Sequence, residues 1–111
     1  MIVASNWKMN PPLDVAGALA RALTAREFSR VRRILFAPHP YLVPMAVRLK
    51  GSDIRLGGQD CHVKAAGAHT GDVSAAMLRD CGATAVLLGH SERRADHAET
   101  SDIVAAKVEQ A

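Results

Sequence analysis

Residues 85–94 read Ala-Val-Leu-Leu-Gly-His-Ser-Glu-Arg-Arg, and this stretch decides the fold. Four apolar residues before a glycine predict a strand that is buried on both faces, as strands of parallel sheets are. Gly89 ends the strand, so His90 stands at its carboxyl end. In parallel α/β folds ligands bind at that edge of the sheet. His90 is therefore a candidate site residue, and a histidine that only closes a turn is the alternative.

A short helix is predicted to follow His90. Ser91 can cap its first turn, and Glu92 suits the positive end of the helix. Backbone N–H groups that point at an imidazole disfavour its charged form. We therefore expect His90 to be uncharged and to donate a hydrogen bond from its ring.

The composition describes an ordinary globular protein. A chain of 111 residues can form one small domain with its own core. The net charge of +3 includes a cluster of Arg30, Arg32 and Arg33 without interleaved aromatic residues, so a solvated surface is expected and nucleic-acid binding is not. No signal peptide or membrane-spanning run is visible. Cys61 and Cys81 fit no metal-binding spacing, and we expect free thiols in a cytoplasmic protein.

Strands and helices alternate along the chain. Strands are predicted at 2–5, 34–37, 54–57 and 84–88, and helices at 13–27, 41–50, 74–81 and from about residue 100. This order predicts a parallel sheet with right-handed crossovers, either doubly wound or part of a barrel that needs about twice this length. Lys8, Gln59 and His90 all fall at strand carboxyl ends, which favours the barrel. The last helix shows no stop signal before Ala111, so the sequence is expected to continue.

The first strand is predicted to deliver Asn6 and Lys8 to its carboxyl end. Alternation along a strand points these two side chains to one side and Trp7 to the other. Lys8 is a candidate anion-binding residue, and a lysine that extends into solvent is the alternative. A long polar loop follows the third strand, and loops of this length in α/β domains are usually functional.

Three motifs resemble those of the triosephosphate isomerase family. They are an opening motif at 6–10, an interface loop from Gly67 to Asp72, and an electrophile motif at 89–94. From residue 2 onward the chain is similar to the N-terminal portion of that family. The resemblance implies a (β/α)8 TIM barrel, of which residues 1–111 are the N-terminal part of a single domain and cover about the first four β/α units.

The resemblance also implies the chemistry. The family interconverts dihydroxyacetone phosphate and glyceraldehyde 3-phosphate through an enediolate, in glycolysis and gluconeogenesis. His90 would be the neutral catalytic electrophile, and Lys8 would be catalytic and bind substrate together with Asn6 and Ser91. Glu92 would orient Lys8. No metal and no organic cofactor is implied, because a carboxylate removes the proton that carbonyl polarisation acidifies.

Two implied features concern the rest of the family's fold and its assembly. The family's glutamate base and glycine-rich phosphate turns occur later in its sequence, so this chain alone is predicted to be inactive unless completed. Thr70 is implied to reach across a homodimer interface toward Asn6 of the partner subunit. His69 replaces an aromatic residue of the family's interface loop and would make the loop sensitive to pH, and Asp72 replaces a glutamate.

Two other functions are compatible with these residues. A non-catalytic half-barrel could bind a phosphorylated ligand or a partner without turnover. A different sugar-phosphate isomerase or aldolase could share the fold, although it would then have to share the constellation of Asn6, Lys8 and His90.

Overall fold

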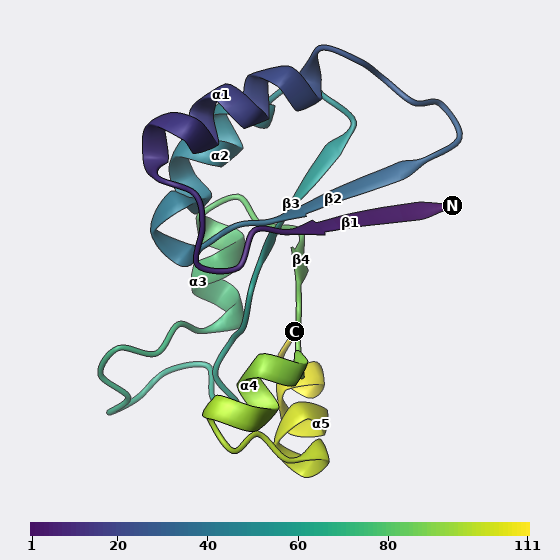
Figure 1. The fold of residues 1–111 in the computed structure, drawn as a ribbon. Coiled ribbons are helices and arrows are strands. Elements are labelled where there is room, and N and C mark those ends of the chain that lie inside the picture. The colour runs from purple at the N-terminus through teal and green to yellow at the C-terminus, as the bar shows by residue number, and fades with distance from the viewer.

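A computed structural model describes residues 1–111 as one four-stranded parallel sheet with helices between the strands (Figure 1). The strands, in sheet order, are β1 (Ile2–Asn6), β2 (Arg32–Phe36), β3 (Ile54–Gly58) and β4 (Ala85–Val86). The helices are α1 (Leu13–Thr24), η1 (His39–Tyr41, a 3₁₀ turn), α2 (Leu42–Leu49), α3 (Ala75–Asp80), α4 (Ser91–Asp96) and α5 (Ser101–Gln110). The longest of them has 12 residues, and none is long and apolar enough to cross a membrane.

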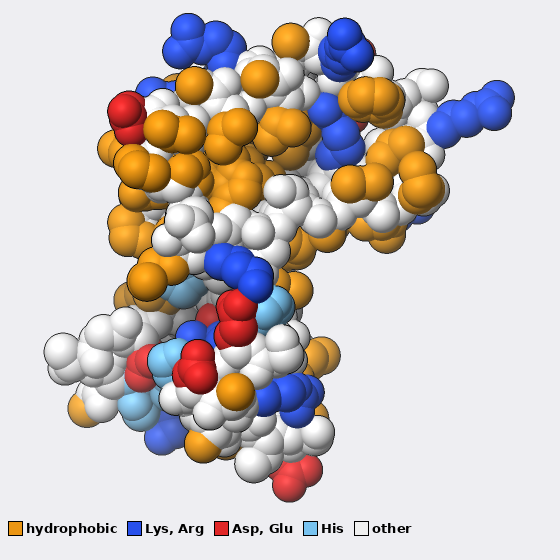
Figure 2. Space-filling model, in the orientation of Figure 1, with side chains coloured by type: hydrophobic (Ala, Val, Ile, Leu, Met, Phe, Trp, Pro, Cys, Tyr) orange, Lys and Arg blue, Asp and Glu red, His pale blue; other side chains and the backbone are white.

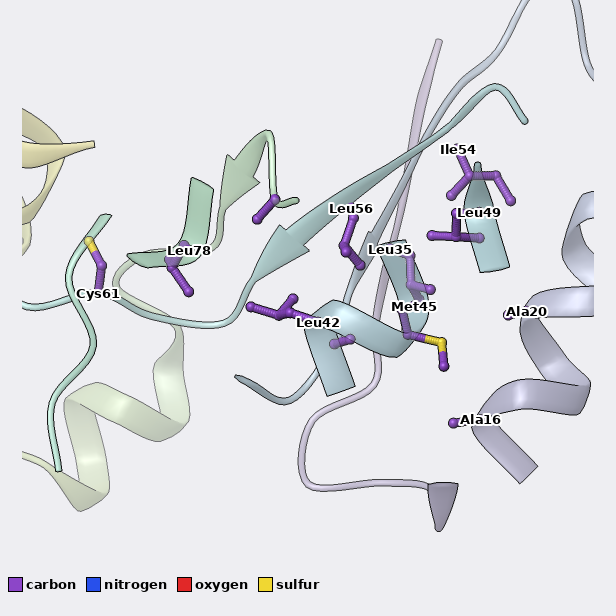
Figure 3. Close-up of a cluster of buried hydrophobic side chains, with 12 residues drawn as sticks. Ala16, Ala20, Leu35, Leu42, Met45, Leu49, Ile54, Leu56, Cys61 and Leu78 are labelled. Atoms are coloured by element: carbon purple, nitrogen blue, oxygen red, sulfur yellow. The ribbon is translucent and has the colours of Figure 1, made fainter. Parts of the chain in front are cut away.

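The core lies between one face of the sheet and the helices α1, α2 and α3 (Figure 3). Its largest fully buried side chains are Leu35 of β2, Leu42 and Met45 of α2, and Cys61 after β3. Burying a leucine or methionine side chain contributes about 1.5–3 kcal/mol, so this layer fixes the strands against the helices. Burial also raises the pKa of Cys61, which therefore stays a thiol at neutral pH.

Helix α1 forms where it is predicted, but its small residues make the buried face. Ala16, Gly17 and Ala20 are buried, whereas Leu19 and Leu23 are 41% and 37% exposed. A Cβ atom on Gly17 would lie 2.9 Å from the Arg48 side chain of α2. Small residues thus let α1 approach α2 closely, and Leu19 and Leu23 lie outside that contact.

The prediction that α1 continues to residue 27 is wrong, because the Arg33 side chain ends it. Arg33 donates hydrogen bonds of 2.7 Å to the carbonyl oxygens of Leu23 and Arg26 and forms an ion pair with Asp53. The helix therefore ends at Thr24. The sequence suggested that Arg33 belongs to a solvated basic surface. Instead, its side chain extends from β2 and binds carbonyl oxygens at the end of α1.

Strand β4 is shorter than predicted and only half-buried. Its ladder with β3 consists of Gly57 with Ala85 and Gly58 with Val86. Two further bonds flank the ladder, from the Thr84 N–H to the Leu56 carbonyl and from the Leu87 N–H to the Gly58 carbonyl. The expectation of a strand buried on both faces is wrong here, since β4 is an edge strand whose core contacts lie toward α3. Strand β1 forms the other edge of the sheet.

Candidate active site

The carboxyl ends of all four strands converge on a cleft of about 490 Å³. Lys8, Gln59 and His90 line it together, as their positions at strand ends predict. Histidine side chains and most of the acidic side chains in view gather in the half of the molecule that holds α4, whereas Lys and Arg occur in both halves (Figure 2). The other polar lining residues are Asn6, His39, Asp60, Glu92, Arg93, Asp96 and His97.

The backbone of Lys8 adopts a left-handed conformation, with φ of 55°. This conformation costs about 1–2 kcal/mol for a residue with a Cβ atom. Two polar side chains hold it: the Lys8 N–H donates to Asn6 Oδ1 at 2.9 Å, and Gln59 Nε2 donates to the Lys8 carbonyl at 3.0 Å. Trp7 packs against the core. Asn6 and Lys8 thus face one cleft, but a turn beyond the strand end, not strand alternation, directs Lys8.

Lys8 forms an ion pair with Glu92 of α4, with Nζ 2.5 Å from Oε1. The hydrogen bond from Lys8 lowers the pKa of Glu92, so the carboxylate is ionised at neutral pH. Both side chains are 51% exposed, and exposed ion pairs contribute at most about 1 kcal/mol to stability. The role of the pair is therefore to position the Lys8 ammonium group, which remains accessible to an anion in the cleft.

His90 caps helix α4 through its ring. Nδ1 accepts a hydrogen bond of 3.2 Å from the Glu92 N–H, whereas the Glu92 carboxylate lies 3.5 Å from the same nitrogen, too far for a good bond. The prediction that Ser91 caps the helix is wrong: the imidazole occupies the capping position, and Ser91 is the first helical residue. Since Nδ1 is an acceptor, the ring proton resides on Nε2, which is the donor of the uncharged ring.

Gly89 makes the turn that presents His90. Its φ is 65°, and a Cβ atom there would lie 2.9 Å from Val104 of α5. The Arg94 side chain donates to the Gly89 carbonyl at 2.8 Å and closes the turn from the other side. Only glycine combines this conformation with this approach of α5.

A buried ionic cluster supports the floor of the cleft, and the sequence analysis missed it. Lys107 Nζ lies 2.7 and 2.9 Å from the Asp60 oxygens and 2.5 Å from Glu99 Oε1, while Arg93 bonds Asp60 at 2.9 Å and Glu99 at 2.7 Å. Burial raises the pKa of Glu99, but the hydrogen bonds from Lys107 and Arg93 outweigh it and lower that pKa. One signal in the sequence could have indicated that Lys107 is buried: it follows Ile103 by four residues, at the spacing of one face of a helix.

His39 is a second residue that the sequence analysis missed. Its ring lines the cleft, and its Nε2 is buried without a hydrogen-bond partner. Burial lowers the pKa of His39, so the ring is uncharged at neutral pH. It adds no positive charge to the cleft, whose cations are Lys8 and Arg93, and Arg93 is bound to Asp60 and Glu99.

Ser91, His69 and Thr70 do not line the cleft. Ser91 is exposed on the first turn of α4. His69 and Thr70 lie in the loop between β3 and α3, which projects from the body of the structure (Figure 1). Thr70 is exposed there, and the His69 ring packs against the His62 ring.

Parallel β/α units in the unreversed strand order β1-β2-β3-β4, with a polar site at the carboxyl edge of the sheet, match the first half of the (β/α)8-barrel class. The triosephosphate isomerase family model matches residues 1–111. The chain belongs to the triosephosphate isomerase family, as its three motifs predict.

Relatives agree with this assignment over nearly the whole chain. Triosephosphate isomerase of Caulobacter vibrioides is 49% identical over 113 residues, which cover 99% of this chain and 44% of the relative. That of Jannaschia sp. is 51% identical over 110 residues, covering 96% and 43%. The crystal structure of triosephosphate isomerase from Bartonella henselae has a TM-score of 0.85 and 38% identity, and the match covers 98% of this chain and 46% of that one. The chain thus spans less than half the length of these relatives.

Proposed function

We propose that residues 1–111 supply the first four β/α units of a single-domain triosephosphate isomerase, which interconverts dihydroxyacetone phosphate and glyceraldehyde 3-phosphate. The observation that carries this proposal is the position of Lys8 and His90 in one cleft at the strand carboxyl ends. The family match supports it. The enzyme would act in glycolysis and gluconeogenesis in the cytoplasm.

His90 and Lys8 stabilise the negative charge of the reaction, which lies on the enediolate and on the phosphate. The Nε2 proton of His90 donates to the substrate carbonyl oxygen and to the enediolate oxygen that develops from it. Lys8 binds the phosphate and stabilises the enediolate, and an incoming anion competes with Glu92 for its ammonium group. Asn6 holds the Lys8 backbone and contacts substrate, and the Ser91 hydroxyl contributes to the phosphate side.

Two of the three cleft carboxylates are engaged in ion pairs and make poor general bases. Glu92 is bound to Lys8, and Asp60 is bound to Lys107 and Arg93. Asp96 is the carboxylate that lines the cleft without an ion pair. We infer that the proton is removed by a carboxylate from beyond these residues, so the 111-residue chain alone is inactive.

We further propose that the enzyme is a homodimer assembled through the loop from Gly67 to Asp72. The loop projects from the body of the structure and contains the exposed Thr70. Thr70 would contact the partner subunit near its Asn6, and His69 would line the same interface. Size-exclusion chromatography with light scattering on a Thr70→Arg variant tests this. A large charged side chain in the interface loop should prevent dimerisation and yield monomers.

A chimeric barrel tests the catalytic proposal. Residues 1–111 replace the matching 44% of the Caulobacter vibrioides relative, and the rest of that enzyme completes the barrel. The protein is expressed in a host without its own isomerase. We expect isomerisation, with kcat lowered about 100-fold or more by His90→Gln while the circular dichroism spectrum is unchanged. Lys8→Ala should weaken binding of a phosphate-bearing inhibitor, and Lys50→Ala, at the far end of β3, is its matched control.

The 111-residue chain alone distinguishes this proposal from a ligand-binding half-barrel. We expect no turnover above the His90→Gln background. If the chain turns over substrate and Asp96→Asn abolishes this turnover, the chain contains its own base. The proposal that the base lies beyond residues 1–111 would then be wrong. Binding of the phosphate-bearing inhibitor by the chain, together with an inactive chimera, would favour the non-catalytic half-barrel.

A further inference from the structure

His62, His69 and Asp72 form a cluster in the loop between β3 and α3, outside the cleft. One ligand atom from each residue lies within 4.8 Å of the other two. The imidazole rings are 4.1 Å apart between centroids, and His62 Nε2 lies 3.7 Å from Asp72 Oδ2. The three side chains line a small cavity of about 80 Å³.

The backbone of the loop places these side chains together. The His62 N–H donates to the Val73 carbonyl at 2.8 Å, which closes the base of the loop. The Asp72 N–H donates to the His69 carbonyl at 3.0 Å, which fixes the returning arm. His62 therefore faces His69 and Asp72 across the loop through two main-chain bonds, so bringing the three ligands together requires little further ordering of the chain.

We propose that His62, His69 and Asp72 bind a divalent transition-metal ion such as Zn²⁺. Two imidazoles and one carboxylate favour zinc, copper or nickel over magnesium or calcium, which prefer all-oxygen ligands. Ligand atoms of a tetrahedral zinc site lie about 3.4 Å apart, given metal–ligand distances of 2.0–2.1 Å. The His62 and Asp72 atoms, 3.7 Å apart, are nearly at that separation. The ligand atoms all lie within 4.8 Å of one another, so no pair must close by more than about 1.4 Å.

Binding through His62 Nε2 changes one hydrogen bond, which gives the proposal a local reporter. His62 Nδ1 accepts from the Lys64 N–H at 3.1 Å, so the proton of the uncharged ring is on Nε2. Coordination through Nε2 moves this proton to Nδ1 and breaks the bond. Lys64 is exposed, so its amide then bonds to water. Lys64 also lines the cavity, and its positive charge opposes a cation nearby.

The test is a zinc titration of the purified, untagged chain in a Cys81→Ser background, because Cys81 is a partly exposed free thiol. A chromophoric chelator reports competition for the ion. We expect one equivalent of Zn²⁺ to bind, and His62→Asn, His69→Asn and Asp72→Asn each to weaken binding about tenfold or more. His97→Asn, an exposed histidine on α4's C-terminal side, is the matched control and should leave the affinity unchanged.

Two further measurements sharpen the result. Lys64→Gln should tighten zinc binding, since it removes a positive charge from the cavity wall. In an amide NMR spectrum, zinc should shift the Lys64 resonance more than that of Lys50, which lies at the other end of the sheet. Zinc that binds equally well to all three ligand variants, or a Lys64 amide that does not respond, overturns the proposal.

The chimeric barrel supplies the same titration in a protein whose activity reports its folding. If the 111-residue chain aggregates, one equivalent of zinc lost with His69→Asn in the active chimera supports the site, and absence of binding there overturns it. The proposal uses no residue of the cleft, so its failure is distinguishable from failure of the catalytic assignment, although His69 and Asp72 belong to the loop that we propose as the homodimer interface.

Discussion

Replacing Lys107 by methionine should strongly destabilise the fold. Lys107 is 5% exposed, and its ammonium group lies within 2.9 Å of both Asp60 oxygens and 2.5 Å from Glu99. Methionine preserves the length of the side chain but leaves Arg93 as the only cation beside two carboxylates. Breaking a buried ionic group by removing one partner costs about 3–5 kcal/mol, because the remaining charge is buried without compensation.

Urea unfolding of the chain, followed by circular dichroism, measures this cost. With an m-value of about 2 kcal/mol/M, in the middle of the usual range for urea, the loss lowers the midpoint by roughly 1.5–2.5 M. Lys50→Met at an exposed lysine is the control and should change the free energy of unfolding by less than about 0.5 kcal/mol. Adding Asp60→Asn to Lys107→Met restores the charge balance and should recover part of the loss.

The pH dependence identifies charge as the cause. The pKa of Glu99 is lowered in the folded state, so the unfolded state binds more protons and folding is favoured above the ordinary carboxyl value of 4.5. This contribution is lost as pH falls through the folded-state pKa. Lys107→Met weakens that lowering, so its destabilisation should be largest near neutral pH and shrink below about pH 4. An equal loss at pH 7 and at a pH well below about 4 would refute the electrostatic explanation.

Three further substitutions test the local geometry. Gly89→Ala should cost about 1–3 kcal/mol in a urea titration, because its Cβ meets Val104 at 2.9 Å in a left-handed turn, whereas Gly51→Ala, with φ of 81° and open space around it, should cost less. Ser74→Ala removes the side-chain cap of α3 and should lower stability by about 1 kcal/mol. Lys8→Gly should raise stability by about 1 kcal/mol in the same assay while abolishing binding of a phosphate-bearing inhibitor, since it relieves the strained backbone and removes the cation.

The sequence predicted those features that depend on neighbours in the chain. The order of strands and helices follows from local apolar runs and turn residues, and the helix predicted at 74–81 forms as α3 from Ala75 to Asp80. The gathering of Lys8, Gln59 and His90 follows from one topological rule, because parallel strands present their carboxyl ends at one edge. Each of these inferences needs only a short window of sequence.

Features that depend on residues far apart in the chain could not be predicted in this way. The ionic cluster joins Asp60 to Lys107 across 47 positions, and no local pattern reports that both are buried. The end of α1 is set by Arg33 from the following strand. The backbone turn at Lys8 depends on Gln59, which is 51 positions away. In each case a tertiary contact overrides or completes the local preference.

The contact between Lys8 and Glu92 shows how the sheet itself arranges the site. Strands β1 and β4 are the two outer strands, and about 4.8 Å between neighbours would place them about 14 Å apart in a flat sheet. Yet Lys8, just beyond β1, bonds Glu92, just beyond β4, at 2.5 Å. Curvature that brings the two outer carboxyl ends toward each other accounts for this reach, as it does in a barrel.

Glu92 contacts both residues to which we assign a chemical role, His90 and Lys8. Its N–H fixes the proton of His90 on Nε2, and its carboxylate holds the ammonium group of Lys8. Glu92→Gln keeps the first bond and removes the charge of the second. In the chimeric barrel we therefore expect this variant to displace Lys8 and raise KM. The hydrogen bond from His90, and with it kcat, should change less. A kcat that falls as far as in His90→Gln, with KM unchanged, would contradict this separation of the two roles.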